Sequence, residues 1–351
     1  MNRRRFIAEA GAFFVGCTCG GLRPRAQDMP TTISTSRAGL DIIDFHAHCM
    51  IPAVTELVRE TPFARTIPKF QILTDDRLRA MDARGIATQA LSINQYWWYG
   101  ADRALAADVV RLHDEGLAAL CAKNPTRFVA LSSPALQFPE LAADQLRHAM
   151  LNLGFRGASI GGHVQGVTPT DQRFDPFWKA AQDLDAPIFV HPNNAENVAR
   201  DGVWNGGGDL GNIIGNPLET TLFLTRMIFD GVLDRFPRLK LVAAHGGGFV
   251  TSYLGRTAVA CHVRENAGCR NEKEPYEYFR DQIWVDSLVF SPEAIRHLVA
   301  EVGAKQIVYG SDMPFSWPDT TDDVLRAPAL NDMDKRAILR GNAANLLKLS
   351  V

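Results

Sequence analysis

The sequence lacks the features that would place it in several common classes of protein. Its formal net charge is only −2 over 351 residues. This near-neutral balance shows no basic field and no run of like charge suggests a binding tail, so we expect no nucleic-acid partner. No CxxC pair occurs among its six cysteines, which argues against a disulfide scaffold. Cys261 and Cys269 could be bridged after export, but their spacing alone does not predict a bond.

The first 26 residues differ from the rest of the chain. Arg3, Arg4 and Arg5 precede an apolar stretch over 10–21 that is too short to span a bilayer. This pattern predicts a signal peptide of the twin-arginine type over 1–26, and hence a periplasmic protein without stable membrane insertion after export. One alternative is an uncleaved basic N-terminus. Another is a lipid anchor at Cys17, which is disfavoured because Phe14 stands where a small aliphatic residue is usual.

From residue 41 onward, short β-branched segments alternate with longer amphipathic segments. Eight strands interleaved with helices predict a single α/β domain, a (β/α)8 TIM barrel over 41–351, with 27–40 as a linker. The predicted strands are Ile42–His48, Thr88–Ile93, Phe128–Pro134, Phe155–Gly161, Pro187–His191, Lys240–His245, Ile283–Leu288 and Gln306–Asp312. The predicted helices are Asp75–Arg84, Asp102–Lys123, Glu140–Asn152, Phe177–Leu184, Glu219–Phe236, Pro292–Val302 and Asp332–Leu347.

Polar side chains stand where four of the predicted strands end. His46 and His48 are two residues apart on the first strand, so their imidazoles share a face. His191, His245 and Asp312 end the fifth, sixth and eighth strands. Because the carboxyl ends of barrel strands converge on one face, these groups predict a site for a divalent ion with an open position for water.

The remaining polar residues near these strands refine the predicted metal site. The fourth strand contains no lysine, and a bridged two-metal site in this architecture usually uses a carboxylated lysine there, so we expect one ion. Zn²⁺ is the ion we predict, with Mn²⁺ as the alternative. Asp44 is expected to accept a hydrogen bond from an imidazole N–H. His163 either lines the substrate pocket or is a loop histidine in water.

Aromatic residues are concentrated at 96–99, directly after the second strand. On the catalytic face, Trp97 and Trp98 would form a wall for a flat or unsaturated substrate. The alternative is a hydrophobic loop that packs beneath a neighbouring segment or at a dimer contact. The His-Gly-Gly-Gly motif that begins at His245 resembles an oxyanion motif of lipases, but no G-x-S-x-G elbow is present, so serine hydrolysis is disfavoured.

Several motifs together carry a resemblance to a known family. They are Asp44–His48, Val190–Pro192, Gly215–Pro217, Phe236–Pro237, His245–Gly248, Gly255–Arg256, Val285–Ser287 and Gly310–Pro314. Over residues 41–350 the chain resembles the branch of the amidohydrolases that includes aminocarboxymuconate-semialdehyde, resorcylate and carboxyvanillate decarboxylases. These motifs are specific for the branch and much less specific for any one substrate.

The resemblance implies a role for each polar residue of the site. His46, His48, His191 and Asp312 would be the metal ligands. His245 would stand beside the metal-bound water as a base or an orienting group, and His245 and Asp312 would be the catalytic residues that move the proton.

The resemblance also implies how a substrate carboxylate is held. Arg256 would bind it from the neighbouring subunit of a homodimer, and a guanidinium suits that task because it pairs with a carboxylate through two parallel hydrogen bonds. The alternative for Arg256 is an ion pair on a helix surface. A second carboxylate-binding arginine of the family has no clean match here, and Arg59 and Arg65 are both candidates.

These observations favour a metal-dependent, non-oxidative decarboxylase that acts on a small aromatic or enoic carboxylic acid. The alternative is hydrolysis of a lactone, ester or amide by the same single-metal site. A third hypothesis is an exported binding or structural protein with a vestigial barrel, and the intact set of histidines and Asp312 argues against it.

Overall fold

A computed structural model describes residues 37–350 except 38, 94, 194–197 and 200–201. The predicted signal peptide over 1–26 and most of the predicted linker therefore lie outside the described residues. The compact unit begins at Arg37, whose guanidinium forms ion pairs with Asp319 and Asp322. No helix in the described part of the chain combines the length and the apolar character needed to cross a membrane.

The strands are parallel and follow one another around a closed barrel. They are β1 (Ile42–His48), β2 (Ile86–Ser92), β3 (Phe128–Ala130), β4 (Ala158–Gly161), β5 (Pro187–His191), β6 (Lys240–Ala243), β7 (Ile283–Asp286), β8 (Ile307–Val308) and β9 (Gly310–Met313). Two sheets, β3-β2-β1-β9 and β4-β5-β6-β7-β8, are joined by a parallel bridge between Ser132 and Ala158. The predicted eighth strand is interrupted at Tyr309, so β8 pairs with β7 and β9 pairs with β1.

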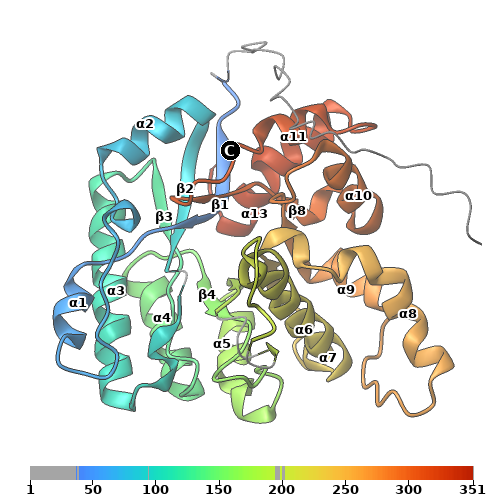
Figure 1. The fold of residues 1–351 in the computed structure, drawn as a ribbon, viewed down its shortest axis with the longest axis horizontal. Coiled ribbons are helices and arrows are strands. Elements are labelled where there is room, and N and C mark those ends of the chain that lie inside the picture. The colour runs from blue at the N-terminus through green and yellow to red at the C-terminus, as the bar shows by residue number, and fades with distance from the viewer. Residues whose placement is uncertain (1–36, 38, 94, 194–197, 200–201, 351) are drawn as a thin grey trace, which may run out of the picture. The chain divides into compact units, whose positions relative to one another are not determined.

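Helices surround the strands (Figure 1). They are α1 (Ala53–Val58), α2 (Asp75–Arg84), α3 (Arg103–Lys123), α4 (Pro139–Asn152), α5 (Asp175–Asp183), α6 (Asn216–Phe229), α7 (Val232–Arg235), α8 (Leu254–Val263), α9 (Pro275–Asp281), α10 (Pro292–Val302), α11 (Thr321–Arg326), α12 (Asp332–Arg336) and α13 (Asn342–Leu347). The helix predicted over 219–236 is divided because Gly231 adopts a left-handed conformation with φ 71°. The helix predicted over 332–347 contains a π-helical turn at Ala337–Gly341.

Side-chain caps fix where several of these helices begin. The carboxylate of Asp102 accepts the backbone N–H of Leu105 at the start of α3, and the hydroxyl of Ser291 accepts that of Ala294 at the start of α10. Each cap satisfies a backbone donor that has no partner within its helix. These local signals explain why α3 and α10 begin within a residue of their predicted positions.

The interior of the barrel is filled by apolar side chains from alternating positions of the strands. Ile43, Phe45, Phe189 and Val242 belong to one buried cluster, and α13 contributes four residues to the same cluster. Because these α13 residues belong to the same cluster, the C-terminal helix packs against the interior of the barrel. The catalytic candidates lie beyond this packed layer, since the ring of Phe189 contacts the ring of His46 at 4.9 Å between centroids.

A bulge in β1 changes which side chains share a face. Asp44 is opposite Gln89 and Ala47 is opposite Leu91, so β1 has one residue more than β2 between these pairs. Such an extra residue shifts the alternation of side chains along the strand. As a result the Asp44 carboxylate accepts hydrogen bonds from Ser311 and Gln89, and the prediction that it accepts an imidazole N–H is wrong.

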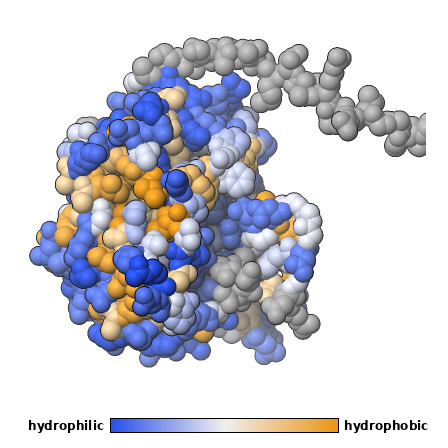
Figure 2. Space-filling view, turned by 60° about the vertical axis from the view of Figure 1, so that its left-hand side comes forward, coloured by the Kyte–Doolittle hydropathy of each residue, from blue (hydrophilic) through white to orange (hydrophobic). Residues whose placement is uncertain are grey.

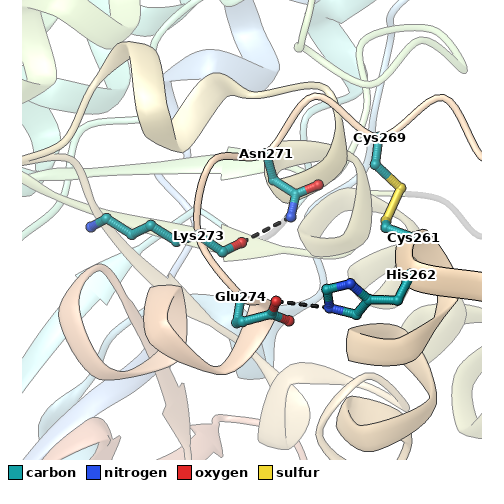
Figure 3. The surroundings of a disulfide bond; sticks show 6 residues. All are labelled: Cys261, His262, Cys269, Asn271, Lys273 and Glu274. Carbon is teal, nitrogen blue, oxygen red and sulfur yellow. Dashed lines mark hydrogen bonds and ion pairs between the residues drawn. A yellow bond between two sulfur atoms is a disulfide. The ribbon is translucent and has the colours of Figure 1, made fainter.

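The structure contains a disulfide that the spacing of the cysteines did not predict. Cys261 near the end of α8 is bonded to Cys269, eight residues later. Figure 3 shows this bond beside the ion pair between His262 Nε2 and Glu274 at 2.8 Å. Together they tie the end of α8 to the segment that leads into α9. Cys49 and Cys121 are free thiols.

The surface is of ordinary mixed character. On the face drawn in Figure 2, hydrophilic residues predominate and hydrophobic residues gather over a limited area. Elsewhere, Tyr253, Val259 and Val263 are large hydrophobic residues at or near α8 that are more than half exposed. Arg256, which is predicted to reach the substrate of a neighbouring subunit, belongs to the same helix. This surface is therefore the candidate for the predicted dimer contact.

Candidate metal centre and active site

Four side chains from three strand ends meet at one point. His46, His48, His191 and Asp312 each offer a ligand atom, and these atoms all lie within 4.8 Å of one another. All four residues are buried. Asp312 Oδ1 lies 3.3 Å from His46 Nε2 and 3.2 Å from His48 Nε2. The structure thus brings together the four residues predicted to be metal ligands.

The other nitrogen of each imidazole is held by an acceptor. His46 Nδ1 donates to Asp286 Oδ2 at 2.6 Å, and His191 Nδ1 donates to the carbonyl of Pro192 at 3.0 Å. His48 Nδ1 lies 2.9 Å from the hydroxyl of Ser92. That hydroxyl donates to the carbonyl of Ala47, so it accepts from the ring. Fixing the proton on Nδ1 leaves Nε2 as the lone-pair nitrogen that a metal requires.

The donor set fits a single divalent ion. Three imidazole nitrogens and one carboxylate oxygen are the ligands that Zn²⁺ and related ions prefer. Asp312 Oδ1 is buried and has no hydrogen-bond donor among the described residues, and a buried carboxylate oxygen without a donor or a cation is costly. The residues present therefore form a site for one divalent metal ion.

Burial and charge set the protonation of the imidazoles. Burial lowers the pKa of His48 to about 4, and burial followed by the charge of neighbouring imidazoles lowers that of His191. Burial also acts to lower the pKa of His46, but neighbouring carboxylates, Asp312 foremost, outweigh it and raise the pKa to about 10. His48 and His191 are therefore neutral donors at pH 7, whereas His46 loses a proton when an ion binds.

Asp286, at the end of β7, accepts hydrogen bonds from several groups of the site. Its Oδ2 accepts both His46 Nδ1 and the backbone N–H of His245, the latter at 3.0 Å. Its Oδ1 accepts the backbone N–H groups of Gly246 and Leu288 at 2.9 and 3.0 Å. One buried carboxylate thus orients a ligand imidazole and the turn that carries His245. Sequence reasoning recorded Asp286 only within a family motif and gave it no role.

His245 stands beside the ligand cluster. Its ring centroid lies 5.3 Å from that of His46 and 5.5 Å from that of His191. His245 and Asp312 both adopt left-handed backbone conformations, with φ 56° and 55°, which non-glycine residues adopt at a cost and mainly at functional sites. Both residues line a cavity of about 590 Å³ that opens over the cluster.

Other walls of this cavity come from residues that the sequence did not single out. Gln95, Asn193, Trp204, Phe315 and Trp317 line it together with His191. They belong to the segments that follow β2, β5 and β9. The general rule that barrel loops after the strands line the active site points to these segments, but no local pattern distinguishes these residues from their neighbours.

A second cavity, of about 370 Å³, shares Gln95 and Asn193 with the first. Trp97 and His163 line this second cavity. The guanidinium of Arg65 lies 5.5 Å from the centroid of the Trp97 ring. His163 is buried and its Nδ1 accepts the backbone N–H of Gly166 at 3.0 Å, so it is not a loop histidine in water.

Trp98 does not face either cavity. Its side chain is fully buried in the core, and its ring packs against His113 of α3 at 5.0 Å between centroids. The expectation that Trp98 contacts substrate is therefore wrong. The tight turn at Trp97–Gly100 directs these adjacent indoles differently, so the second packs against the neighbouring helix α3, in agreement with the alternative of a loop packed against a neighbouring segment.

The candidate arginines occupy different environments. Arg256 lies on α8, is exposed and is absent from the walls of the metal-site cavity. Arg59 is exposed and forms ion pairs with Glu56 and Glu60. Of the two candidates for the second arginine, only Arg65 reaches a cavity beside the metal centre.

Comparison with known proteins identifies the family. A family model described as amidohydrolase matches residues 43–349. The chain is 31% identical over 314 residues to the 2-amino-3-carboxymuconate-6-semialdehyde decarboxylase of Dictyostelium discoideum, covering 88% of this chain and 84% of the relative. It is 30% identical over 290 residues to the gamma-resorcylate decarboxylase of a Rhizobium species, covering 79% of this chain and 88% of the relative.

A solved structure shows the same arrangement of elements. The dihydroxybenzoic acid decarboxylase of a Polaromonas species, with bound manganese and the inhibitor 2-nitroresorcinol, matches with a TM-score of 0.75 and 26% identity. The match covers 88% of this chain and 96% of that chain. The family model spans nearly all of the barrel, from β1 to the residues after α13. The resemblance carried by the sequence motifs is confirmed, and the chain belongs to the amidohydrolase family.

Proposed function

We propose that this protein is a metal-dependent carboxy-lyase that removes CO2, without oxidation, from a small aromatic or enoic carboxylic acid. The observation that carries the proposal is the buried cluster of His46, His48, His191 and Asp312, two members of which, His191 and Asp312, line a 590 Å³ cavity. The named relatives are decarboxylases of compounds of this class. When bound, a divalent ion supplies Lewis-acid chemistry to the substrate oxygens.

The residues of the chain would divide the remaining work. His46, His48 and His191 hold the ion through Nε2, because their Nδ1 atoms are engaged elsewhere. His245 and Asp312 would pass a proton from water to the substrate carbon as its bond to the departing CO2 breaks. Burial lowers the pKa of His245, so its imidazole is available to take up a proton and pass it on.

The second cavity indicates what else the substrate carries. Trp97 offers a flat aromatic face and Arg65 a half-buried cation beside it. A ring in the metal-site cavity with an anionic substituent directed toward Arg65 would use both. We therefore propose Arg65 and Trp97 as substrate-binding residues, with His163 as a buried wall of the same cavity.

Removing one metal ligand tests the proposal. We expect His191→Ala and Asp312→Ala each to lose both the bound ion and turnover, measured by metal analysis and by CO2 release from a panel of dihydroxybenzoates. His148→Ala, an exposed histidine of α4, should behave like the wild type. Full activity in a metal-free ligand variant contradicts the assignment, and ring-opened acid from lactones without CO2 release would favour hydrolysis.

The identity of the ion is open to direct measurement. Three nitrogen donors favour Zn²⁺, whereas the related Polaromonas structure contains manganese. We propose Zn²⁺ with Mn²⁺ as the alternative. Metal analysis of the purified protein, followed by activity after reconstitution with each ion, decides between them.

We further propose that the protein is exported and forms a homodimer. The arginine-rich apolar segment over 1–26 supports export to the periplasm, and the Cys261–Cys269 bond is of a kind that persists in oxidising compartments. The exposed hydrophobic residues of α8 support a dimer contact that would carry Arg256 toward the partner's substrate. N-terminal sequencing of the protein recovered from cells tests the export signal.

A further inference from the structure

A third cavity lies on the far side of Phe315 from the metal centre. It measures about 590 Å³ and is bounded by the segment Lys69–Gln71, by α2 and by the residues that follow β9. Phe315 and Ser316 line both this cavity and the metal-site cavity. We call it the basic pocket and define it by Lys69, Phe70, Arg77, Arg84 and Phe315.

The basic pocket carries an excess of positive charge. Lys69, Arg77 and Arg84 line it together with a single acid, Asp76, and that acid is paired with Arg79. Within the described ranges of the chain, none of the three cations forms an ion pair. Unpaired cations gathered around one cavity favour an anionic occupant.

The hydrogen bonds of the two arginines go to neutral acceptors, although the Asp44 carboxylate acts electrostatically on Arg77. Arg77 donates to the Gln89 side chain at 3.1 Å and to the carbonyl of His48 at 2.8 Å. Arg84 donates to the carbonyl of Trp317 at 3.3 Å. All three acceptors are neutral, so these bonds orient the guanidinium groups without cancelling their charge. An anion in the pocket would meet cations that are already held in place.

The other walls of the pocket are aromatic and apolar. The rings of Phe70 and Phe315 lie 5.9 Å apart between centroids at an interplanar angle of 73°, and Ile72, Met313 and Pro314 complete this side. An edge-to-face pair of rings bordering an open cavity is a surface on which another aromatic ring packs well. Aromatic walls beside unpaired cations match a ligand that has a ring and a carboxylate.

We propose that the basic pocket is a second binding site, separate from the metal centre, for an aromatic carboxylate. The ligand ring would pack on Phe70 and Phe315, and its carboxylate would pair with Lys69 and Arg84. The cations and aromatic walls of the basic pocket indicate this class of ligand, and the proposed substrate belongs to the same class. The protein would then bind molecules of this class at two places.

Occupancy of the basic pocket would be felt at the metal centre through two contacts. The Phe315 ring lies 6.2 Å from the ring of His48 between centroids, and Arg77 holds the carbonyl of that same histidine. A ligand packed behind Phe315 restricts this shared wall. We therefore expect an aromatic carboxylate to lower turnover in a way that excess substrate does not relieve.

Calorimetric titration of the metal-loaded protein with benzoate tests the proposal. Lys69→Gln combined with Arg84→Gln should bind one molar equivalent of benzoate less than the wild type, or bind it at least about tenfold more weakly. The matched control combines Lys123→Gln with Arg226→Gln, which removes the same charge from exposed positions outside the described cavities. Arg77 is left in place because it contacts the backbone of a metal ligand.

Binding by the Lys69/Arg84 variant that equals the wild type in stoichiometry and affinity overturns the proposal. If that variant does not fold, Lys69→Glu alone reverses a charge at an exposed position and should still weaken the same binding event. In steady-state kinetics, benzoate inhibition of the variant should become purely competitive. A protein that binds two equivalents but releases no CO2 contradicts the proposed function and leaves this site standing.

Discussion

At the scale of single residues, the Asp286 carboxylate supports the metal site in two ways without being one of the predicted ligands. It fixes the Nδ1 proton of His46 and anchors the backbone of His245. Burial alone would raise its pKa, but the hydrogen bond and the charge of His46 outweigh burial, and the pKa is lowered. The group is therefore an anion that accepts and does not donate, as a ligand imidazole requires.

We expect Asp286→Asn to weaken metal binding by about 10–100-fold, because an amide presents a donor where two N–H groups need an acceptor. Competition with a chelator of known affinity measures the loss. Asp44→Asn is the control, since that buried carboxylate accepts from Ser311 and Gln89 and not from an imidazole. Equal losses of affinity in the two variants would show that burial of charge, and not orientation of the ring, is what matters.

A second buried carboxylate makes stability depend on pH. Burial raises the pKa of Asp114 on α3 to about 7, against a lowering by the hydrogen bond from Ser132. Asp114 lines a surface cavity of about 310 Å³, and the other charged or titratable groups that line it are Arg111, Glu115, Asp144 and His148. Arg111 is paired with Glu115, and Asp144 is paired with Arg147, so none is committed to Asp114.

Because the folded-state pKa lies above the unfolded value, this group favours folding when protonated, and that contribution is lost as pH rises toward and through about 7. We expect Asp114→Asn to reduce the fall in unfolding free energy between pH 5 and pH 8 by on the order of 3 kcal/mol. Urea unfolding of both proteins at the two pH values measures it. Parallel pH profiles would mean that Asp114 is solvated in the native protein.

The metal ligands could be predicted from the sequence because each stands at the end of an apolar strand, where the barrel rule makes position and function coincide. Trp97 and Trp98 could not be separated, since adjacent residues of a loop have no periodicity that tells inside from outside. The hydrogen-bonding role of Asp44 was also misjudged, because an alternation rule has no means of anticipating an extra residue within β1.

At the scale of the element, the turn after β6 depends on its glycines. Gly246, Gly247 and Gly248 all have positive φ, and a Cβ on Gly248 would lie 2.3 Å from the carbonyl oxygen of Pro217. The turn thus lets the chain approach the start of α6 closely. In this structure the motif serves packing and the placement of His245, which explains why it occurs without a nucleophilic serine.

We expect Gly248→Ala to destabilise the fold by roughly 3 kcal/mol or more, because the substitution adds both a backbone penalty and a steric clash. Gly255→Ala is the matched control. It lies within α8 with nothing within 4 Å of its Cβ position, and there alanine should stabilise by about 0.5–1 kcal/mol. Thermal unfolding of both variants distinguishes them, and equal stabilities would contradict the packing role of the turn.

Element boundaries followed the sequence where local signals were strong. The helix α2 matches its predicted range, and Gly85 ends it in a left-handed conformation with φ 72°. The short helices α1, α8, α9 and α11 were not predicted, because six to ten residues carry too few apolar positions to reveal a period. The lengths of the strands were overestimated at β3, β4, β6 and β7.

At the scale of the whole molecule, the placement of Arg256 predicts that a second copy completes the site. In one chain this residue is exposed and does not line the metal-site cavity. We expect Arg256→Gln to raise the KM for a carboxylate substrate by at least about tenfold without loss of the metal. Light scattering measures the assembly state, and a fully active monomer would contradict this arrangement.

The interruption of the last strand at Tyr309 affects how the first and last strands pair to close the barrel. β1 and β9 meet through an irregular register, with Gly310 opposite His46 and Met313 opposite Ala47. His46 and Asp312 stand on opposite sides of this seam, one near the beginning of the chain and one near its end. An ion bound between them would join the first and last strands at the point where the register of their backbone pairing is irregular.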